Sequence, residues 1–272
     1  MILSILVHLE ALTDGKFDQF TGRGVHGFWF QRWREVDEKF GNELHAGSEV
    51  QPFTLSPLLG LPRAQRGVFS VAKGLACRFR LTVLSDALGE AVLSKWVDGL
   101  EGHVIQIPES KDEQAGISWK VTGCEVESQA EYDVLSKKHL MNSVPPRQWT
   151  VEFLTPTTFH GRETHLPFPL PDSLIQSWMR RWNAFAPIAL PDEVLEWSRQ
   201  KLAVSSFTLK TLPAREADRL RVGCVGRLSL RALEMPPYLR AAIDLLAHYS
   251  SYCGSGSHTS QGLGQTRIVM SR

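Results

Sequence analysis

The sequence predicts an α+β protein of two consecutive halves, each an antiparallel sheet with helices on one face. Strand-like and helix-like patterns alternate along the chain, and the order of the first half is repeated in the second. The 272 residues are 43% hydrophobic and 22% charged, an ordinary globular composition that excludes a disordered or collagen-like chain. The pair Pro145-Pro146 marks the expected boundary, so we predict domains at residues 1–144 and 145–272.

The first half has the order β-α-β-β-α-β, which is that of a ferredoxin-like domain. Apolar residues alternate with polar ones over residues 3–9, which predicts a half-buried strand. An apolar stripe that includes Val25, Trp29 and Trp33 predicts a helix over residues 25–40. The other expected elements are a loop over 41–67, a hairpin of strands at 68–71 and 76–84, a helix over 86–100, and strands at 103–107 and 117–127.

The second half repeats this order. Its expected elements are a strand at 148–153, a turn-rich excursion over 160–171, helices at 172–184 and 191–200, strands at 204–209 and 223–231, a helix that ends near Gly254, and a strand at 266–270. Two ferredoxin-like (RRM-like) domains in tandem are therefore predicted. Sheets of this kind are a common surface for binding RNA.

Several classes of protein are excluded by simple counts. No apolar run reaches the roughly 18 to 20 residues that span a bilayer, and the N-terminus lacks the pattern of a signal peptide. The four cysteines are far apart and form no CxxC pair, so neither a disulfide framework nor a zinc site is expected. We expect a cytoplasmic protein with no membrane contact.

Charge is distributed unevenly, although the formal net charge is only +1. Residues 1–198 hold 19 Lys and Arg against 25 Asp and Glu, a balance of −6. Residues 199–272 hold 11 against 4, a balance of +7. Such asymmetry indicates a polyanion partner or a solvated basic face.

A glycine-rich segment follows the last expected helix. It holds four glycines in eleven residues (Gly254, Gly256, Gly262 and Gly264), so its backbone N–H groups are able to face phosphate oxygens. It is neither a GxxxxGK[ST] loop for nucleotide triphosphates nor a GxGxxG dinucleotide fingerprint, because the lysine and the third glycine are missing. A plain turn and a phosphate-binding loop both remain open on this pattern alone.

The C-terminal region resembles the signature of the CRISPR repeat-processing endoribonucleases, the Cas6 family of the RAMP superfamily. The residues that carry the resemblance are GCVGRLSL and then LLAHYSSYCGSGSHTSQGLGQTRIV, in which Thr259 and Gln265 complete the family's GxGxxTxxGxGQ pattern. HGFWFQRW, ELHAGSEVQPFTLSPL, WTVEFLTPTTF and LPFPLPDSLIQSWMRRWN extend the resemblance over nearly the whole chain.

The resemblance implies an endoribonuclease that needs no metal and no cofactor. Such an enzyme cuts CRISPR precursor transcripts within the repeat by attack of a ribose 2′-OH, leaving a 5′-hydroxyl and a 2′,3′-cyclic phosphate. Its partner is CRISPR repeat RNA, and other subunits of an effector complex are a further implied partner. The alternatives are a subunit that binds repeat RNA without cutting it and a small-molecule enzyme that uses the glycine-rich segment for phosphate.

Two histidines match positions where the family places catalytic ones. His45 lies in ELHAG after the first expected helix, and His26 lies at the start of that helix. Histidine suits both proton transfers because its ordinary pKa is about 6.5. Many relatives carry a tyrosine on this helix and a lysine after the loop histidine. This chain has Phe30 and no Lys or Arg over 46–56, so we predict a two-histidine mechanism with Arg23 or Lys39 as the cation.

The RNA-binding residues are expected in the C-terminal half. Arg227 and Arg231 share one face of their strand, away from the core face of Leu228 and Leu230. The glycine-rich segment is expected to add Gly256, Ser257, His258, Thr259, Gln261, Gly262 and Gly264. Arg180 and Arg181 are expected to be charges on a helix surface between core tryptophans, and no metal ligands are expected.

Overall fold

The computed structural model describes residues 1–17, 20–47, 49–65, 68–108, 116–161, 165–216 and 219–269. The strands are β1 (Ile2–Ala11), β2 (Gly15–Phe17), β3 (Phe53–Leu55), β4 (Phe69–Val71), β5 (Ala76–Val83), β6 (Val104–Pro108), β7 (Gly116–Ala130), β8 (Gln148–Thr157), β9 (Phe159–His160), β10 (His165–Leu166), β11 (Leu202–Glu216), β12 (Arg219–Ala232) and β13 (Thr266–Val269). The helices are α1 (Gly22–Val36), α2 (Glu38–Ala46), α3 (Asp86–Ala91), the π-helix η1 (Val92–Trp96), α4 (Tyr132–Leu140), α5 (Pro171–Phe185), α6 (Glu193–Lys201), α7 (Pro237–Cys253) and the 3₁₀-helix η2 (Thr259–Gln261).

The N-terminal half is a five-stranded antiparallel sheet in the order β3-β5-β1-β7-β6. Strand β1 buries Leu3, Ile5 and Val7 as its alternating pattern predicts. Helix α1 packs its apolar stripe on this sheet, and Trp29 and Trp33 on that stripe are fully buried. This packing places the start of α1 beside the C-terminal half.

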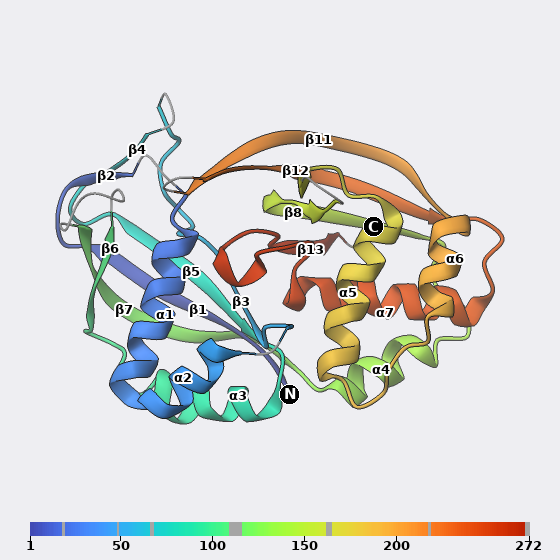
Figure 1. Ribbon diagram of the computed structural model, residues 1–272, viewed down its shortest axis with the longest axis horizontal. Coiled ribbons are helices and arrows are strands. Elements are labelled where there is room, and N and C mark those ends of the chain that lie inside the picture. The colour runs from blue at the N-terminus through green and yellow to red at the C-terminus, as the bar shows by residue number, and fades with distance from the viewer. Residues whose placement is uncertain are drawn as a thin grey trace.

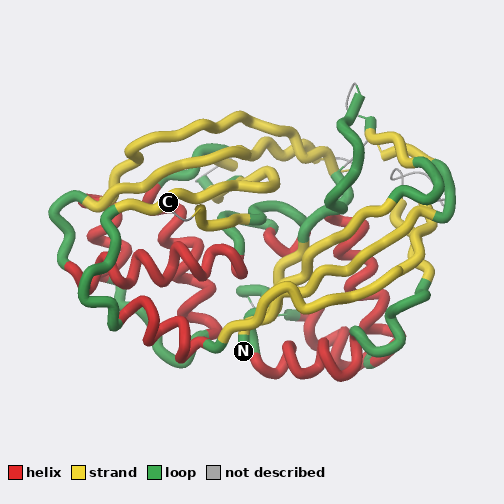
Figure 2. Tube along the Cα trace, turned by 180° about the vertical axis from the view of Figure 1, so that it is seen from behind, coloured by secondary structure: helices red, strands yellow, loops and turns green. Residues whose placement is uncertain are grey.

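The C-terminal half is a four-stranded antiparallel sheet in the order β11-β12-β8-β13. Helices α5 and α7 pack together below it, and the two sheets stand next to each other with their helices on one face (Figures 1 and 2). In both halves the first and third strands of the motif pair at the centre, with the second and fourth outside them. The predicted tandem of ferredoxin-like folds is confirmed. No helix within the described ranges is long and apolar enough to cross a membrane.

The predicted helix over 25–40 is in fact two helices. Helix α1 ends at Val36, and the side chain of Asp37 accepts a hydrogen bond of 3.1 Å from the N–H of Phe40, which caps a new helix. Helix α2 then continues to Ala46 through residues that were expected to be loop. The capping aspartate is the sequence signal for this second helix, and it was overlooked. His45 therefore lies on a helix and not in a loop.

The predicted hairpin of strands at 68–71 and 76–84 was wrong. Strand β4 pairs with β2, whereas β5 pairs with β1 and with β3. The second strand of the motif is therefore β3, a three-residue strand inside the expected loop. Its neighbours Pro52 and Pro57 gave the segment the composition of a loop.

Helix α4 was not predicted, and it packs with the C-terminal core. Tyr132 at its start contacts Trp182 and Tyr249, with ring centroids 5.3 and 6.1 Å away. Ile2 and Leu84 of the first half belong to the same core. The halves thus share packing across the predicted boundary, and the division at residue 144 stays a prediction.

Candidate active site

The two histidines predicted to be catalytic lie on either side of one aromatic ring. His26 is near the start of α1, and His45 is in the last turn of α2. The ring centroid of Phe30 lies 5.0 Å from that of His26 and 4.8 Å from that of His45. His45 is exposed and His26 is half-buried. The structure therefore gathers both imidazoles around Phe30, the residue that stands in place of the family's tyrosine.

A backbone carbonyl fixes the protonation of His26. Its Nδ1 lies 2.9 Å from the carbonyl oxygen of Ser260, which only accepts, so Nδ1 carries the proton and Nε2 keeps its lone pair in the neutral ring. Burial lowers the pKa of His26 below 6.5, the Ser260 bond opposes this, and the charges of His45 and Arg23 lower it further. His26 is thus suited to accept a proton at Nε2, and Arg23 rather than Lys39 is the cation that acts on it.

The glycine-rich loop, Gly254–Gln265, needs its glycines for its own shape. All four have positive φ angles between 67° and 95°. A Cβ on Gly256 would lie 2.2 Å from the carbonyl oxygen of Thr158, and one on Gly264 would lie 2.0 Å from that of Ser255. The backbone approaches too closely for any side chain, so the loop is a packed element rather than a plain turn.

Much of the polar backbone of this loop is already bonded within the protein. The N–H and the hydroxyl of Ser257 both donate to the carbonyl of Thr158, at 2.8 and 3.1 Å. The N–H groups of Gly264 and Gln261 donate to Pro156 and His258. RNA contact by the loop stays a prediction for Gly256, Ser257, Thr259, Gln261, Gly262 and Gly264. The fold does not present an open cradle of N–H groups, because those of Gly256, Ser257, Gln261 and Gly264 are already bonded within the protein.

The loop also joins the two halves, and it lies between them beside α1 (Figure 1). The side-chain amide of Gln265 donates to the carbonyl of Leu55 at 3.1 Å. A Cβ on Gly22, at the start of α1, would lie 2.0 Å from the carbonyl oxygen of Gln261. Close contact of α1 with η2 is what places Ser260 against His26.

A polar cleft of about 480 Å³ opens beside the loop. Its walls are α5, the segment after α2 and the glycine-rich loop, and they include Gln51, Gln176, Arg180, His258 and Ser260. Ser260, whose carbonyl holds His26, is therefore part of the cleft wall. The cleft offers hydrogen-bond donors beside Ser260, and the charge of Arg180 on its wall is paired with Glu49.

Three more histidines gather at this end of the C-terminal half. The ring centroids of His160, His165 and His258 lie 5.2 to 6.2 Å apart. Burial lowers the pKa of His258 to about 4, with the charges of Arg221 and the two neighbouring histidines acting in the same direction. This brings His258, predicted to contact RNA, together with the predicted turn-rich excursion, of which residues 162–164 lie outside the described ranges.

The two arginines predicted on strand β12 are both exposed. Arg227 donates to Glu152 at 3.0 Å, and Glu152 also binds Arg267, so part of the positive charge on this face is neutralised. Leu228 and Leu230 are fully buried as predicted. Contact of Arg227 and Arg231 with RNA stays a prediction, and Arg231 is the stronger candidate because no acidic partner is recorded for it in the described part of the chain.

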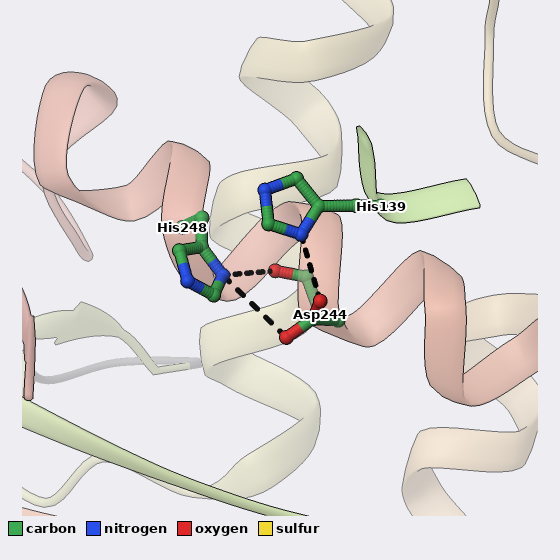
Figure 3. Close-up of side chains that lie close together, drawn as sticks. All are labelled: His139, Asp244 and His248. Carbon is green, nitrogen blue, oxygen red and sulfur yellow. Dashed lines mark hydrogen bonds and ion pairs between the residues drawn. The ribbon is translucent and has the colours of Figure 1, made fainter. Parts of the chain in front are cut away.

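One group of side chains has the composition of a metal site. His139 on α4 and Asp244 and His248 on α7 each offer a donor atom within 4.8 Å of the others (Figure 3). Nδ1 of His139 donates to the Asp244 carboxylate at 2.7 Å, Trp149 donates to the same carboxylate at 2.9 Å, and Nδ1 of His248 donates to the Asp244 carbonyl. These bonds account for the cluster as a network of hydrogen bonds that ties α4 to α7.

Sequence similarity adds to this geometry. The family model of the CRISPR-associated endoribonuclease Cas6 matches residues 151–266. The structure of a Thermus Cas6 (TTHA0078) in its product complex is 25% identical, with a TM-score of 0.73, over 99% of this chain and 100% of that one. The family model thus covers the C-terminal part of the chain, and the whole chain shares the fold of this Cas6 structure.

Other Cas6 structures share the fold over the same extent. The product complex of Thermus thermophilus Cas6 (TTHB231) has a TM-score of 0.76 at 22% identity, with coverage of 99% of this chain and 100% of that one. A Cas6-related protein from Pyrococcus furiosus has a TM-score of 0.65 at 12% identity, and both chains are fully covered. Among curated protein sequences none matches this chain.

One residue has a role that the sequence did not indicate. Arg181 was expected on a helix surface, but it is half-buried and its guanidinium contacts the glycine-rich loop. Helical spacing contained the signal, because Arg181 follows the buried Trp178 by three residues and directly precedes the buried Trp182.

Proposed function

We propose that this chain is a metal-independent endoribonuclease of the Cas6 kind, which cuts CRISPR precursor transcripts within the repeat to produce guide RNAs. The observation that carries the proposal is the pair of imidazoles around Phe30, with Nδ1 of His26 held by the Ser260 carbonyl. Two imidazoles at one site supply a base and an acid, which is what transesterification by a 2′-OH requires.

In this proposal each histidine has a different proton transfer. Nε2 of His26 accepts the proton of the ribose 2′-OH, since its pKa is lowered and the ring is neutral at neutral pH. The 2′-oxygen attacks the adjacent phosphorus, and the bond from phosphorus to the 5′-oxygen breaks. His45, exposed on the other side of Phe30, donates a proton to the leaving 5′-oxygen. The products are a 2′,3′-cyclic phosphate and a 5′-hydroxyl, and Arg23 stabilises the negative charge of the pentacoordinate phosphorus.

One assay tests this proposal against its alternative. End-labelled RNA of the CRISPR repeat is incubated with the protein in EDTA, beside a copy with 2′-deoxyribose at the cut position. Cleavage in EDTA that the deoxy sugar abolishes is the expected result. Binding without cleavage would instead support a subunit that binds the repeat without cutting it. Phe30 and the missing lysine are the sequence features that favour this alternative. Absence of RNA binding contradicts both functions.

A further inference from the structure

Arg181 clamps the glycine-rich loop from helix α5. Its guanidinium donates to the carbonyl of Gly256 at 2.9 Å and to the hydroxyl of Thr259 at 3.0 Å. The other end of the fork donates to the carbonyl and the hydroxyl of Ser177, at 3.1 and 2.8 Å. The same Ser177 hydroxyl accepts from the N–H of Gly256 at 2.8 Å. Both polar groups of Gly256 are thus held by one turn of α5.

The recorded partners of the Arg181 guanidinium carry no charge. The four recorded acceptors of Arg181 are two carbonyls and two hydroxyls, and three of the four bonds are also shorter than or equal to 3.0 Å. Its neighbour Arg180 is half exposed and pairs with the carboxylate of Glu49. A half-buried guanidinium that makes several bonds at once fixes a backbone, whereas an exposed ion pair contributes little to structure.

The clamp ends one residue from the bond that holds His26. Thr259 begins η2, and the next residue is Ser260, whose carbonyl accepts from Nδ1 of His26. Residue His258, just before Thr259, has a φ of 56°, a conformation that only well-fixed surroundings keep in a residue other than glycine. The chain between Gly256 and Ser260 is therefore held at both ends, by Arg181 and by His26.

We propose that Arg181 is a positioning residue for His26. By fixing Gly256 and Thr259 it holds the Ser260 carbonyl against Nδ1, which keeps the proton on Nδ1 and presents Nε2 to the substrate. The catalytic part of this inference rests on the proposed function, while the structural part does not. A side chain of the C-terminal half thereby controls the tautomer of a histidine in the N-terminal half.

The tautomer is measurable without any cleavage. Protein with ¹⁵N-labelled histidine gives separate NMR signals for protonated and unprotonated ring nitrogens, and the His26→Gln spectrum identifies the signals of His26. In the wild-type protein at pH 8 we expect the Nδ1–H form. In Arg181→Met we expect a mixture with the Nε2–H form, and in the matched control Arg180→Met the wild-type signal. Arg181→Lys is expected to behave like Arg181→Met, because an ammonium keeps the charge but not the fork of donors.

Cleavage provides the second readout. At saturating RNA, Arg181→Met is expected to cut about 10²-fold more slowly, the scale of a misplaced catalytic group, with little change in the half-saturating RNA concentration. If Arg181→Met fails to fold, Ser177→Ala removes only a shared hydroxyl, and it should shift the tautomer in the same direction with a loss of up to about tenfold. The inference is overturned if the folded variants keep the wild-type tautomer and rate. If the wild-type protein cuts no RNA, the proposed function fails, while the NMR result still decides whether Arg181 positions His26.

Discussion

Nδ1 of His26 donates a hydrogen bond of 2.9 Å to the carbonyl of Ser260, a residue 234 positions away. His26 lies on the first helix of one ferredoxin-like half, and Ser260 lies in the loop before the last strand of the other. The bond makes the orientation of a catalytic candidate depend on the backbone of both halves. A site assembled in this way exists only when the two halves are docked, which couples formation of the site to folding of the whole chain.

Removal of either imidazole is expected to abolish most of the cleavage. His26→Ala and His45→Ala should each lower the single-turnover rate on repeat RNA by at least about two orders of magnitude, the usual scale of general acid–base catalysis. The matched control is His8→Ala, because His8 lies on β1 and its recorded partner is Glu125. Wild-type cleavage by His45→Ala would remove His45 from the site.

The dependence of cleavage on pH should report the lowered pKa of His26. If His26 accepts the proton of the 2′-OH, the rate rises with pH through the pKa of His26, so the midpoint of the acid limb should lie below 6.5. Because the charge of His45 contributes to the lowering, His45→Gln should move the pKa of His26 upward in an NMR titration. A midpoint at or above 6.5 in the wild-type rate profile would contradict His26 as the base.

The fold was predictable where elements are long and strongly patterned. Strand β1 and helix α1 bury the residues that their periodicities predict. Strand β3 was not found, because three residues are too few to show a period and its neighbouring prolines indicate a loop. Its place in the sheet is decided by pairing with β5, a contact between distant segments that local sequence does not encode.

Some features of the candidate site were likewise predictable from the sequence, and others were not. The family pattern selected His26, His45 and the glycine-rich loop, and the structure brings all three into one region. The tautomer of His26 and the contacts of Arg181 with the loop were not predictable, since both depend on how α5 and η2 meet α1 across the two halves. Pairwise geometry between distant segments, rather than residue type, decides these features.

The packed glycine-rich loop predicts a large effect for one methyl group. Gly256→Ala places a Cβ 2.2 Å from the carbonyl oxygen of Thr158, on a backbone with φ of 76°, and also disturbs the two bonds of Ser257 to that oxygen. We expect the free energy of unfolding to fall by about 3 kcal/mol or more. The matched control is Gly74→Ala, which has φ of 84° but no heavy atom within 4 Å of the added Cβ.

Gly74→Ala should cost only the conformational penalty of about 1–2 kcal/mol. Urea denaturation of both variants and of the wild-type protein measures the difference. Equal losses of unfolding free energy in the two variants would mean that the loop relaxes to make room for the added methyl group. Its glycines would then be needed only for their positive φ angles.

His258 should make the stability of the protein depend on pH. Its pKa is about 4 in the folded protein, against 6.5 for an ordinary histidine, so between these values the unfolded chain binds the proton more tightly. The contribution is fully present above pH 6.5 and is lost as the pH falls toward 4. His258→Asn removes the titration and suits the left-handed backbone at this position, because asparagine tolerates a positive φ. Between pH 7.5 and pH 5, we expect the free energy of unfolding to fall by about 1 kcal/mol less in this variant than in the wild-type protein, after allowance for partial exposure. Urea denaturation at the two pH values measures this fall. An equal fall in the variant and in the wild-type protein would show that His258 is not buried as the structure has it.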